Sequence, residues 1–429
     1  MTIEKIEVEN FRGFKGKHEV VFQPDVNVFV GVNGAGKSSV LDVLGIIMGD
    51  LISKITHYYY SPLALGSGDV SFETPQTVIK AAFLQDSDKA FFINLAYLST
   101  NNLLSKGINT TDFITSFSSP SLKTYPIFRY FHSKRVWQNT EELTDLKHLP
   151  PQMAAYEGCF HALNSFEKFA KWFKDQENDE NRIKIRTKNI NYEAPLLETV
   201  RKAINTFLSY FKDLNMENIR VEDAKTIYDD INDLCIDKNG VKHNLNQLSS
   251  GEQTTLLIVA DIAHRLAIAN PNLTDKTTGT GIVLIDEIDI HLHPTWQRDI
   301  VLALNKTFPN IQFFITSHSP FIVSAAHKSQ LHVLQNEAGK STFKTVAFNP
   351  YGKTANQILI DFFQLEGTRT RQVDDDFKAL REMVKNGTYE TAAFKTAYDA
   401  LVSKIGKADP DLISINLEIA KRKKIYAEN

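Results

Sequence analysis

A short glycine-rich segment constrains this chain more than any other feature. Residues 31–38 read G-V-N-G-A-G-K-S, follow an apolar run at 26–30 and precede apolar residues at helical spacing from Val40 to Met48. The pattern predicts a strand, a loop and a helix that begins near Lys37. In this setting successive backbone N–H groups and the helix N-terminus face one point, which suits a phosphate group. The chain is therefore expected to contain a P-loop within an α/β domain.

The P-loop chemistry predicts ATP and Mg²⁺ as cofactors. Lys37 is expected to neutralise the β- and γ-phosphate oxygens, and Ser38 is expected to ligate the magnesium ion. The residues expected to contact ATP in this segment are Asn33, Gly34, Ala35, Gly36, Lys37, Ser38 and Ser39.

A second segment has the form of a Walker B element. Residues 282–285 (IVLI) form an apolar run, as expected of a strand that is buried on both faces, and Asp286 and Glu287 follow it directly. We expect Asp286 to orient the magnesium ion and Glu287 to act as the base that polarises the attacking water. A solvated acidic strand end is the alternative where no P-loop is present.

Two further segments have a structural and a functional interpretation. Residues 248–253 (LSSGEQ) open a helix that Ser249 or Ser250 can cap. The segment also resembles the Leu-Ser-Gly-Gly signature of ABC-type ATPases, with Ser250 in place of the first glycine. Residues 316–320 (TSHSP) follow the next predicted strand, where ABC ATPases carry a switch histidine. The resemblance implies that Ser249 and Gly251 contact ATP and that His318 senses the γ-phosphate.

The order P-loop, long insertion, signature, Walker B and switch histidine resembles the SMC/RecF branch of ABC ATPases over residues 1–325. The segments 6–14 (IEVENFRGF), 285–298 (IDEIDIHLHPTWQR) and 308–313 (FPNIQF) are similar to PtuA-type ATPases of Septu and some retron anti-phage systems. The resemblance implies an ABC-type P-loop ATPase head and a head-to-tail homodimer, or a higher even-numbered oligomer, that encloses ATP. It also implies an HNH nuclease partner, PtuB-like, on a separate chain.

The composition limits the possible partners. The chain has 429 residues, with 48 Lys and Arg against 51 Asp and Glu and a net charge of −3, so DNA or another nucleic acid could bind only at a local basic surface. Two cysteines cannot form a disulfide framework, and no apolar stretch is long enough to cross a bilayer. A cytoplasmic protein without membrane contact is expected.

Hydrophobic periodicity predicts four regions. An N-terminal lobe of an α/β ATPase head occupies 1–140, with strands at 78–85, 90–99 and 125–131. A helical insertion follows at 141–240, and the head resumes over 241–350 with a hairpin around Gly339. The region 351–429 is expected to be a helical extension that binds a partner.

Three features keep more than one interpretation. His291 and His293 alternate in a turn, for which a structural role is favoured over metal binding. Residues 182–188 (RIKIRTK) place four cations at period two, so an extended chain would present either a phosphate-tracking face or a solvated edge strand. The glutamine of the Q-loop is assigned to Gln85 as one candidate, with Arg135 as an alternative residue entering the nucleotide site.

Two other functions compete with the nuclease-regulating ATPase. An OLD-type protein would carry its own Toprim nuclease, but the acidic run at 374–376 precedes a helical pattern, where it suits a helix N-terminus better. A RecF-like DNA-repair clamp would bind DNA ends or gaps without any nuclease.

Overall fold

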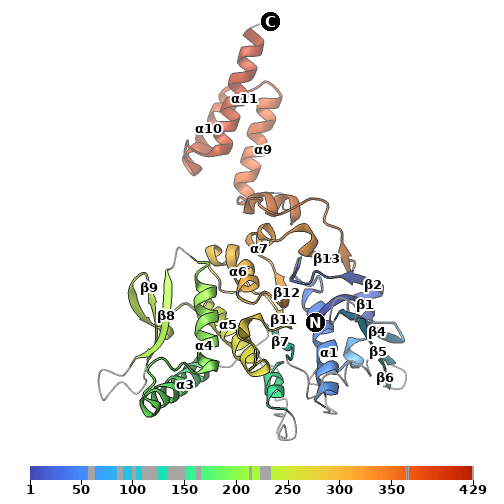
Figure 1. Ribbon diagram of the computed structural model, residues 1–429. Coiled ribbons are helices and arrows are strands. Elements are labelled where there is room, and N and C mark those ends of the chain that lie inside the picture. The colour runs from blue at the N-terminus through green and yellow to red at the C-terminus, as the bar shows by residue number, and fades with distance from the viewer. Residues whose placement is uncertain are drawn as a thin grey trace. The chain divides into compact units, whose positions relative to one another are not determined.

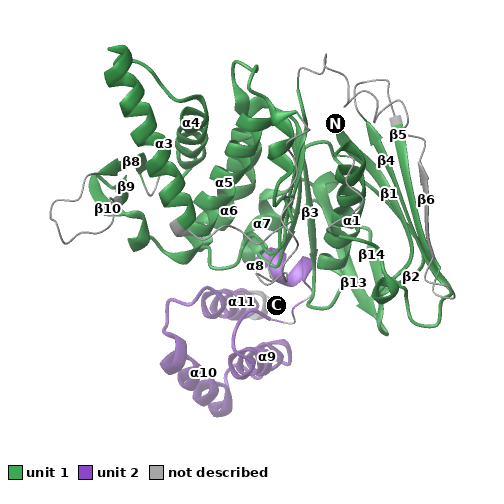
Figure 2. Ribbon diagram, turned by 90° about the horizontal axis from the view of Figure 1, so that it is seen from below, with its two compact units in different colours: residues 1–355 green, residues 356–429 purple. Residues whose placement is uncertain are grey.

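The computed structural model describes residues 1–56, 63–84, 90–98, 103–108, 124–132, 150–160, 166–211, 215–222, 233–363, 365 and 367–427. These residues form two compact units, 1–355 and 356–429 (Figure 2). The boundary lies a few residues after the predicted start of the C-terminal region at 351. Within the described residues, each helix is too short or too polar to cross a lipid bilayer.

A six-stranded sheet forms the centre of the first unit (Figure 1). Its order is β14-β13-β3-β12-β11-β7, and all neighbours are parallel except the β13–β14 hairpin. Strands β3, β7, β11 and β12 are buried along their whole length, as expected of parallel strands that are covered on both faces. The strands are β3 (Val26–Gly31), β7 (Ile127–Phe131), β11 (Gly281–Ile285), β12 (Ile311–Ser317), β13 (Leu331–Glu337) and β14 (Lys340–Lys344).

Parallel pairing brings three strand ends to one edge of this sheet. Ser317 of β12 pairs with Val30 of β3, and Ile315 of β12 pairs with Ile285 of β11. The segments that follow these three strands are the P-loop, the Walker B carboxylates and the segment containing His318. Ligands bind at this edge in open α/β sheets because loops and helix N-termini converge there.

An antiparallel five-stranded sheet with the order β2-β1-β4-β5-β6 lies beside the central sheet. The predicted strands at 78–85, 90–99 and 125–131 are confirmed as β4, β5 and β7. The sequence did not predict β6. The strands of this sheet are β1 (Thr2–Phe11), β2 (Phe14–Val21), β4 (Gln76–Leu84), β5 (Ala90–Leu98) and β6 (Leu103–Ile108).

Helices cover the two faces of the central sheet. Helix α1 (Lys37–Ile55) lies between the two sheets and contacts β3, β11 and β12 (Figure 2). On the other side of the central sheet lie α5 (Ser250–Ala269), α6 (Pro294–Thr307) and α7 (Pro320–Ala325). The positions of α1 and α5 match the helices predicted from Val40 to Met48 and after residues 248–253.

The insertion contains helices and a small sheet. Helices α3 (Phe166–Thr187) and α4 (Pro195–Leu208) match the predicted helical periodicity. Three strands that this periodicity did not predict follow them and form an antiparallel sheet with the order β10-β9-β8. These strands are β8 (Met216–Glu222), β9 (Asp233–Lys238) and β10 (Val241–Asn244).

The basic run at 182–188 is not extended, so both interpretations of it as a strand are wrong. Residues 182–187 form the last turns of α3, where a period of two does not gather side chains on one face. Lys184 instead forms an ion pair with Glu180 one turn earlier, at 2.7 Å, and Glu180 also contacts Arg201 of α4 at 3.2 Å. These contacts tie the end of α3 to α4.

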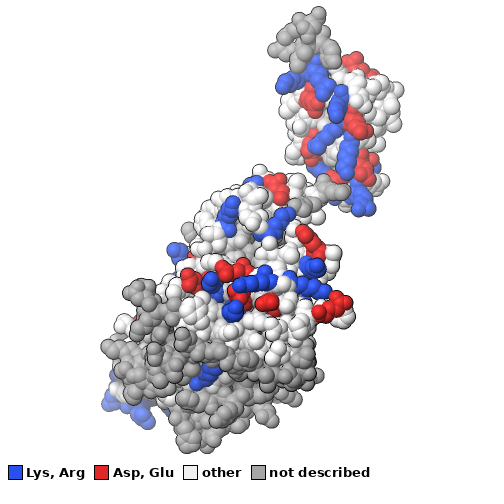
Figure 3. All heavy atoms as spheres, turned by 90° about the vertical axis from the view of Figure 1, so that its right-hand side faces the viewer, with Lys and Arg blue, Asp and Glu red and all other residues white. Residues whose placement is uncertain are grey.

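Opposite charges are interspersed on the face shown in Figure 3, where Lys and Arg side chains lie next to Asp and Glu side chains in both units. Ion pairs cross the five-stranded sheet: Glu7 of β1 contacts Lys17 of β2 at 2.7 Å and Lys80 of β4 at 2.6 Å. On this face, the described residues form no extended basic surface for a phosphate backbone.

The second unit is a three-helix assembly with its own core. Its helices are α9 (Arg371–Lys385), α10 (Ala392–Ile405) and α11 (Pro410–Ala427), and they follow a short helix α8 (Ala355–Gln357) and a π-helical segment, Ile358–Phe362. Arg369 donates to both carboxylate oxygens of Asp409, at 2.8 and 2.9 Å, before α11. The buried core consists of Phe377, Leu380, Val384, Phe394, Leu401, Leu412 and Ile415.

The acidic run at 374–376 lies near the start of α9, with Asp374 in its first turn. The acidic run comes just after the first residues of a helix and does not follow the end of a strand. This position agrees with the predicted role of helix N-terminal charge and gives no support to a Toprim nuclease site.

We predict that Leu380→Ala loosens the second unit selectively. The side chain is 1% exposed, and its loss should destabilise the unit by about 2–5 kcal/mol, the usual cost of such a cavity. Hydrogen exchange should accelerate in α9, α10 and α11 together and stay unchanged in residues 1–355. Ile413→Ala is the control, since Ile413 is 47% exposed. Unchanged exchange in the Leu380 variant would contradict the assignment of a separate cooperative core.

Candidate nucleotide-binding site

The P-loop has the sharp turn that its glycines predict. Strand β3 ends at Gly31 and α1 begins at Lys37, with Gly36 at φ 100° as the residue before the helix. A side chain at Gly36 would adopt a strained left-handed conformation. A Cβ atom at Gly31 would lie 2.2 Å from the carbonyl oxygen of Leu334 in β13. Glycine is therefore required at position 36 by backbone conformation and at position 31 by packing.

Lys37 is held against the loop that it would serve. Its Nζ donates to the carbonyl oxygens of Gly31 and Val32, at 3.1 and 3.2 Å. Burial lowers the pKa of Lys37, although the carboxylates of Glu287, Asp286 and Asp289 oppose that shift. The ammonium group of Lys37 is desolvated and faces carboxylates. It is therefore well suited to bind a phosphate group together with a divalent cation.

Ser38 and Asp286 are brought together as predicted. The Ser38 hydroxyl lies 3.2 Å from each carboxylate oxygen of Asp286, although 248 residues separate the two in the sequence. Hydroxyl and carboxylate oxygens are the ligands that Mg²⁺ prefers. The donor set at this junction of α1 and β11 therefore fits a magnesium ion that is bound jointly with phosphate oxygens.

Thr316 is a site residue that the sequence analysis missed. This fully buried residue of β12 donates its hydroxyl to Asp286 Oδ1 at 2.7 Å and accepts a hydrogen bond from the backbone N–H of Glu287 at 2.7 Å. The sequence signal is a polar residue near the end of a strand whose middle is apolar. Thr316 therefore positions both Walker B residues at once.

Glu287 lies directly beyond the strand in an unusual conformation. Its φ of 52° is left-handed, which is uncommon for a residue other than glycine. Burial raises the pKa of its carboxyl group, and the neighbouring carboxylates of Asp286 and Asp289 raise it further. A carboxylate with a raised pKa is a stronger base than an ordinary glutamate, which suits proton abstraction from water.

His318 follows β12 at the same edge. Its backbone N–H donates to Asp289 Oδ2 at 3.4 Å, and burial, followed by the charge of Lys37, lowers the pKa of its imidazole. The imidazole is therefore neutral near pH 7 and carries one donor and one acceptor nitrogen. Such a group can hydrogen-bond to a phosphate without adding charge.

The segment 248–253 forms a capped helix start. Ser249 caps α5, accepts from the N–H of Glu252 at 3.3 Å, and donates its own hydroxyl to Glu252 Oε2 at 2.9 Å. Lys238 of β9 contacts the other oxygen of Glu252 at 2.8 Å. A Cβ at Gly251 would lie 2.2 Å from the carbonyl oxygen of His291, so glycine is required there.

The structure does not bring this helix start to the P-loop of the same chain. Among the described residues, no hydrogen bond joins Ser249 or Gly251 to residues 31–38. The hollow beside Ser249 is lined instead by the turn at 291–296 and has a volume of about 780 Å³. His293 caps α6, because its Nδ1 accepts from the backbone N–H of Thr295 at 3.4 Å and lies 2.9 Å from the Thr295 hydroxyl, in agreement with the predicted structural role.

Arg12 links the N-terminal strands to α1. Its guanidinium group contacts Asp42 of α1 and Asp69, at 2.9 Å for the latter, and Tyr130 of β7 donates to the other oxygen of Asp42 at 2.8 Å. Burial lowers the pKa of Arg12, but the two carboxylates raise it more. Sequence analysis gave Arg12 no role of its own. Gln85 and Arg135, the two candidates for the Q-loop position, lie outside the described residues.

Comparison with known proteins agrees with this geometry. The family model described as "AAA domain, putative AbiEii toxin, Type IV TA system" matches residues 26–324. The Retron Ec83 probable ATPase of Escherichia coli is 27% identical over 98% of this chain and 87% of that protein. The Septu protein PtuA of Bacillus thuringiensis is 23% identical over 86% of each protein. A solved SMC head domain from Thermotoga maritima is 17% identical, covers 81% of this chain and 100% of that one, and has a TM-score of 0.46.

A P-loop, a Walker B strand end and the segment containing His318 at one edge of a mixed sheet define an ABC-type P-loop ATPase head. The chain belongs to the AAA-domain family whose model covers residues 26–324. The predicted fold and ATPase class are confirmed, and so is the predicted resemblance to the PtuA-type and retron ATPases.

We predict that Thr316→Val impairs turnover without unfolding the protein. Valine keeps the shape but removes the hydroxyl that joins Asp286 to Glu287. Loss of a hydrogen bond to a charged group costs about 1.5–3 kcal/mol, so kcat should fall roughly tenfold or more. The Mg²⁺ concentration that gives half-maximal turnover should rise. Thr316→Ser, which keeps the hydroxyl, should restore both. Steady-state kinetics with a magnesium titration measures the effect, and wild-type values for the valine variant would exclude a positioning role.

Proposed function

We propose that this chain is the Mg²⁺-dependent ATPase of an anti-phage defence system and that two copies close around ATP. The single observation that carries the proposal is the 3.2 Å approach of the Ser38 hydroxyl to both carboxylate oxygens of Asp286. A hydroxyl and a carboxylate at this distance, next to the P-loop lysine, support a shared magnesium site. Relatives named as a probable retron ATPase and as the Septu protein PtuA support the defence role.

The residues at the sheet edge divide the chemistry among them. Magnesium held by Ser38 and Asp286 would neutralise charge on the β- and γ-phosphates. Lys37 contacts the same oxygens, and Glu287 accepts a proton from the attacking water. The neutral imidazole of His318 hydrogen-bonds to the γ-phosphate.

A second copy supplies the other half of each site. Ser249 and Gly251 lie at the N-terminus of a 20-residue helix, where backbone N–H groups favour an anion. No hydrogen bond within the described part of the chain joins them to its own P-loop, so we infer that they contact the γ-phosphate bound by the partner copy. ATP then links the two copies, and hydrolysis releases them.

The defence setting implies a separate effector, which we infer to be an HNH nuclease. The second unit is suited to dock it, because α9–α11 form a folded core of their own while Ile413 and Leu417 of α11 remain 47% and 66% exposed. Two exposed apolar residues four positions apart form a stripe on one helix face, which is a common anchor for a partner protein. Opening and closing of the ATPase dimer would control the nuclease through this unit.

We predict that Glu287→Gln binds ATP but does not turn it over. The amide keeps the shape of the side chain and removes the base, so kcat should fall roughly 10²-fold or more. Uncleaved ATP should then hold two copies together, and size-exclusion chromatography with light scattering should show a dimer or larger assembly that requires Mg-ATP.

Adding Ser249→Arg to Glu287→Gln tests the contribution of the second copy. Arginine should block the shared γ-phosphate face and abolish association while leaving ATP bound to single copies. Ser209→Arg, at an exposed position after α4, is the matched control and should leave association intact. Association that survives Ser249→Arg, or native turnover by Glu287→Gln, would refute the shared-site assignment.

We predict that deleting residues 367–429 separates ATP binding from partner binding. The deletion removes the whole buried cluster of the second unit and no residue of the first. ATP should bind with unchanged affinity, whereas copurification of a coexpressed nuclease subunit should be lost. The full chain alone should not nick DNA. Metal-dependent nicking that survives Lys37→Ala would favour an intrinsic nuclease, and retained copurification would place the docking surface elsewhere.

A further inference from the structure

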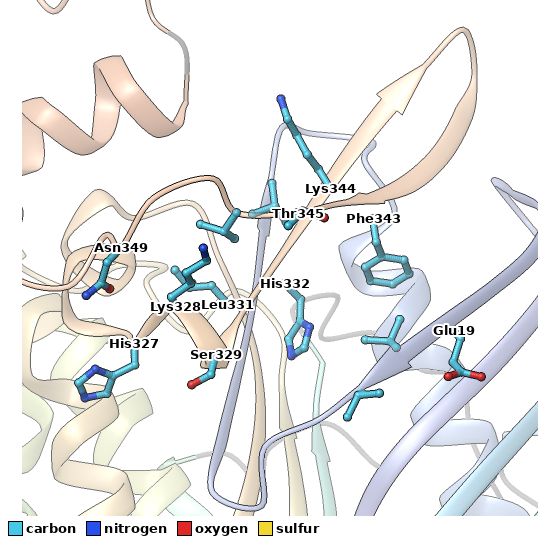
Figure 4. A pocket seen from close by; sticks show the side chains of 14 residues that line it. Glu19, His327, Lys328, Ser329, Leu331, His332, Phe343, Lys344, Thr345 and Asn349 are labelled. Carbon is cyan, nitrogen blue, oxygen red and sulfur yellow. The ribbon is translucent and has the colours of Figure 1, made fainter.

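A groove in the first unit lies between the free edges of two sheets. Strand β2 ends the five-stranded sheet and β14 ends the six-stranded sheet, so within the described part of the chain neither pairs with a strand on its outer side. The groove between them has a volume of about 900 Å³. Figure 4 shows Glu19 on one side, His327, Lys328 and Ser329 on the other, and His332 and Phe343 between them.

The two sheet edges meet at one end and diverge at the other. At the closed end the backbone N–H of Ser341 donates to the carbonyl oxygen of Gly13 at 2.8 Å, and the rings of Phe14 and Phe343 stack at 5.5 Å. Farther along, residues 19–21 of β2 and residues 343–345 line the open groove. The groove is therefore a wedge between β2 and β14, and the two strands lie side by side at its narrow end.

Unpaired backbone groups face this wedge. The N–H of Phe22 donates to the carbonyl oxygen of Glu4 in β1 at 2.8 Å, so the backbone of Phe22 faces β1. Backbone groups alternate in direction along an antiparallel strand, so those of Val21 and Glu19 face outward. No other strand among the described residues donates or accepts a hydrogen bond at these outward groups. A strand edge of this kind can accept an extended peptide as an additional strand.

The charged residues at the rim of the groove favour one kind of ligand. Lys328 and Lys344 are exposed at the rim and form no ion pair with any described residue, whereas the carboxylate of Glu19 contacts Lys5 at 3.4 Å. The floor is apolar at Leu331 and Val333. The rim therefore favours carboxylates, and the floor favours apolar side chains that alternate with them.

We propose that this groove binds an extended acidic segment of a partner protein, which pairs with the outer edge of β2. Alternating side chains of an added strand would place apolar groups on the floor and carboxylates near Lys328 and Lys344. The C-terminal end of this chain does not fit, because residues 421–424 are all Lys or Arg. The proposal concerns a surface apart from the nucleotide site and does not depend on ATP turnover.

Fluorescence anisotropy with the full chain tests the proposal. The probe is a labelled ten-residue peptide of alternating valine and glutamate, compared with its valine–lysine counterpart and with a single-stranded oligonucleotide of equal negative charge. The acidic peptide should bind at least about tenfold more tightly than the basic one. Lys328→Glu with Lys344→Glu should reverse that preference. Lys340→Glu, on the same hairpin but outside the groove lining, is the charge control.

Val21→Pro tests strand pairing separately from charge. Proline removes the outward N–H and is tolerated on edge strands where that group faces solvent. Peptide affinity should fall about tenfold, as expected for one lost backbone hydrogen bond, while Val21→Ala keeps most of it. Equal affinity for the acidic and basic peptides would overturn the proposal, as would tighter binding of the oligonucleotide. If Val21→Pro loses ATP binding and is therefore misfolded, the double lysine variant decides alone.

Discussion

The contact of Ser38 and Thr316 with one carboxylate, that of Asp286, is the constraint on which the site depends. Ser38 belongs to the helix after β3, Asp286 follows β11, and Thr316 ends β12, which lies between them in the sheet. These polar groups meet only if the three strands are parallel and in the observed register. The buried apolar residues of the sheet therefore fix the geometry of the oxygen ligands.

Local signals in the sequence predicted most of the head. The strand before Gly31, the helix after Lys37 and the paired carboxylates at 286 and 287 each have a pattern that is contained within a few residues. Thr316 was missed because its role depends on strand pairing with a residue 30 positions away. The period of two in the basic run at 182–188 does not indicate a strand, because residues 182–187 continue a helix that begins at Phe166.

The small sheet of the insertion shows why longer-range structure is harder to predict. Lys238 of β9 contacts Glu252, which in turn holds Ser249 at the start of α5. A short strand with few apolar residues leaves a weak sequence signal, yet here it supports a helix start that is central to the proposed dimer. One buried carboxylate, that of Glu252, therefore connects the inserted sheet to Ser249.

The charges at the sheet edge explain why the site should require a divalent cation. Asp286, Glu287 and Asp289 lie near a single ammonium group, that of Lys37, and His318 is neutral because burial lowers its pKa. A triphosphate alone would add negative charge to a site that already carries an excess. A divalent cation held by Asp286 would offset that excess, and the remaining carboxylates could then serve as bases. The raised pKa of Glu287 fits this division, since Glu287 would stay free to accept a proton while Asp286 held the cation.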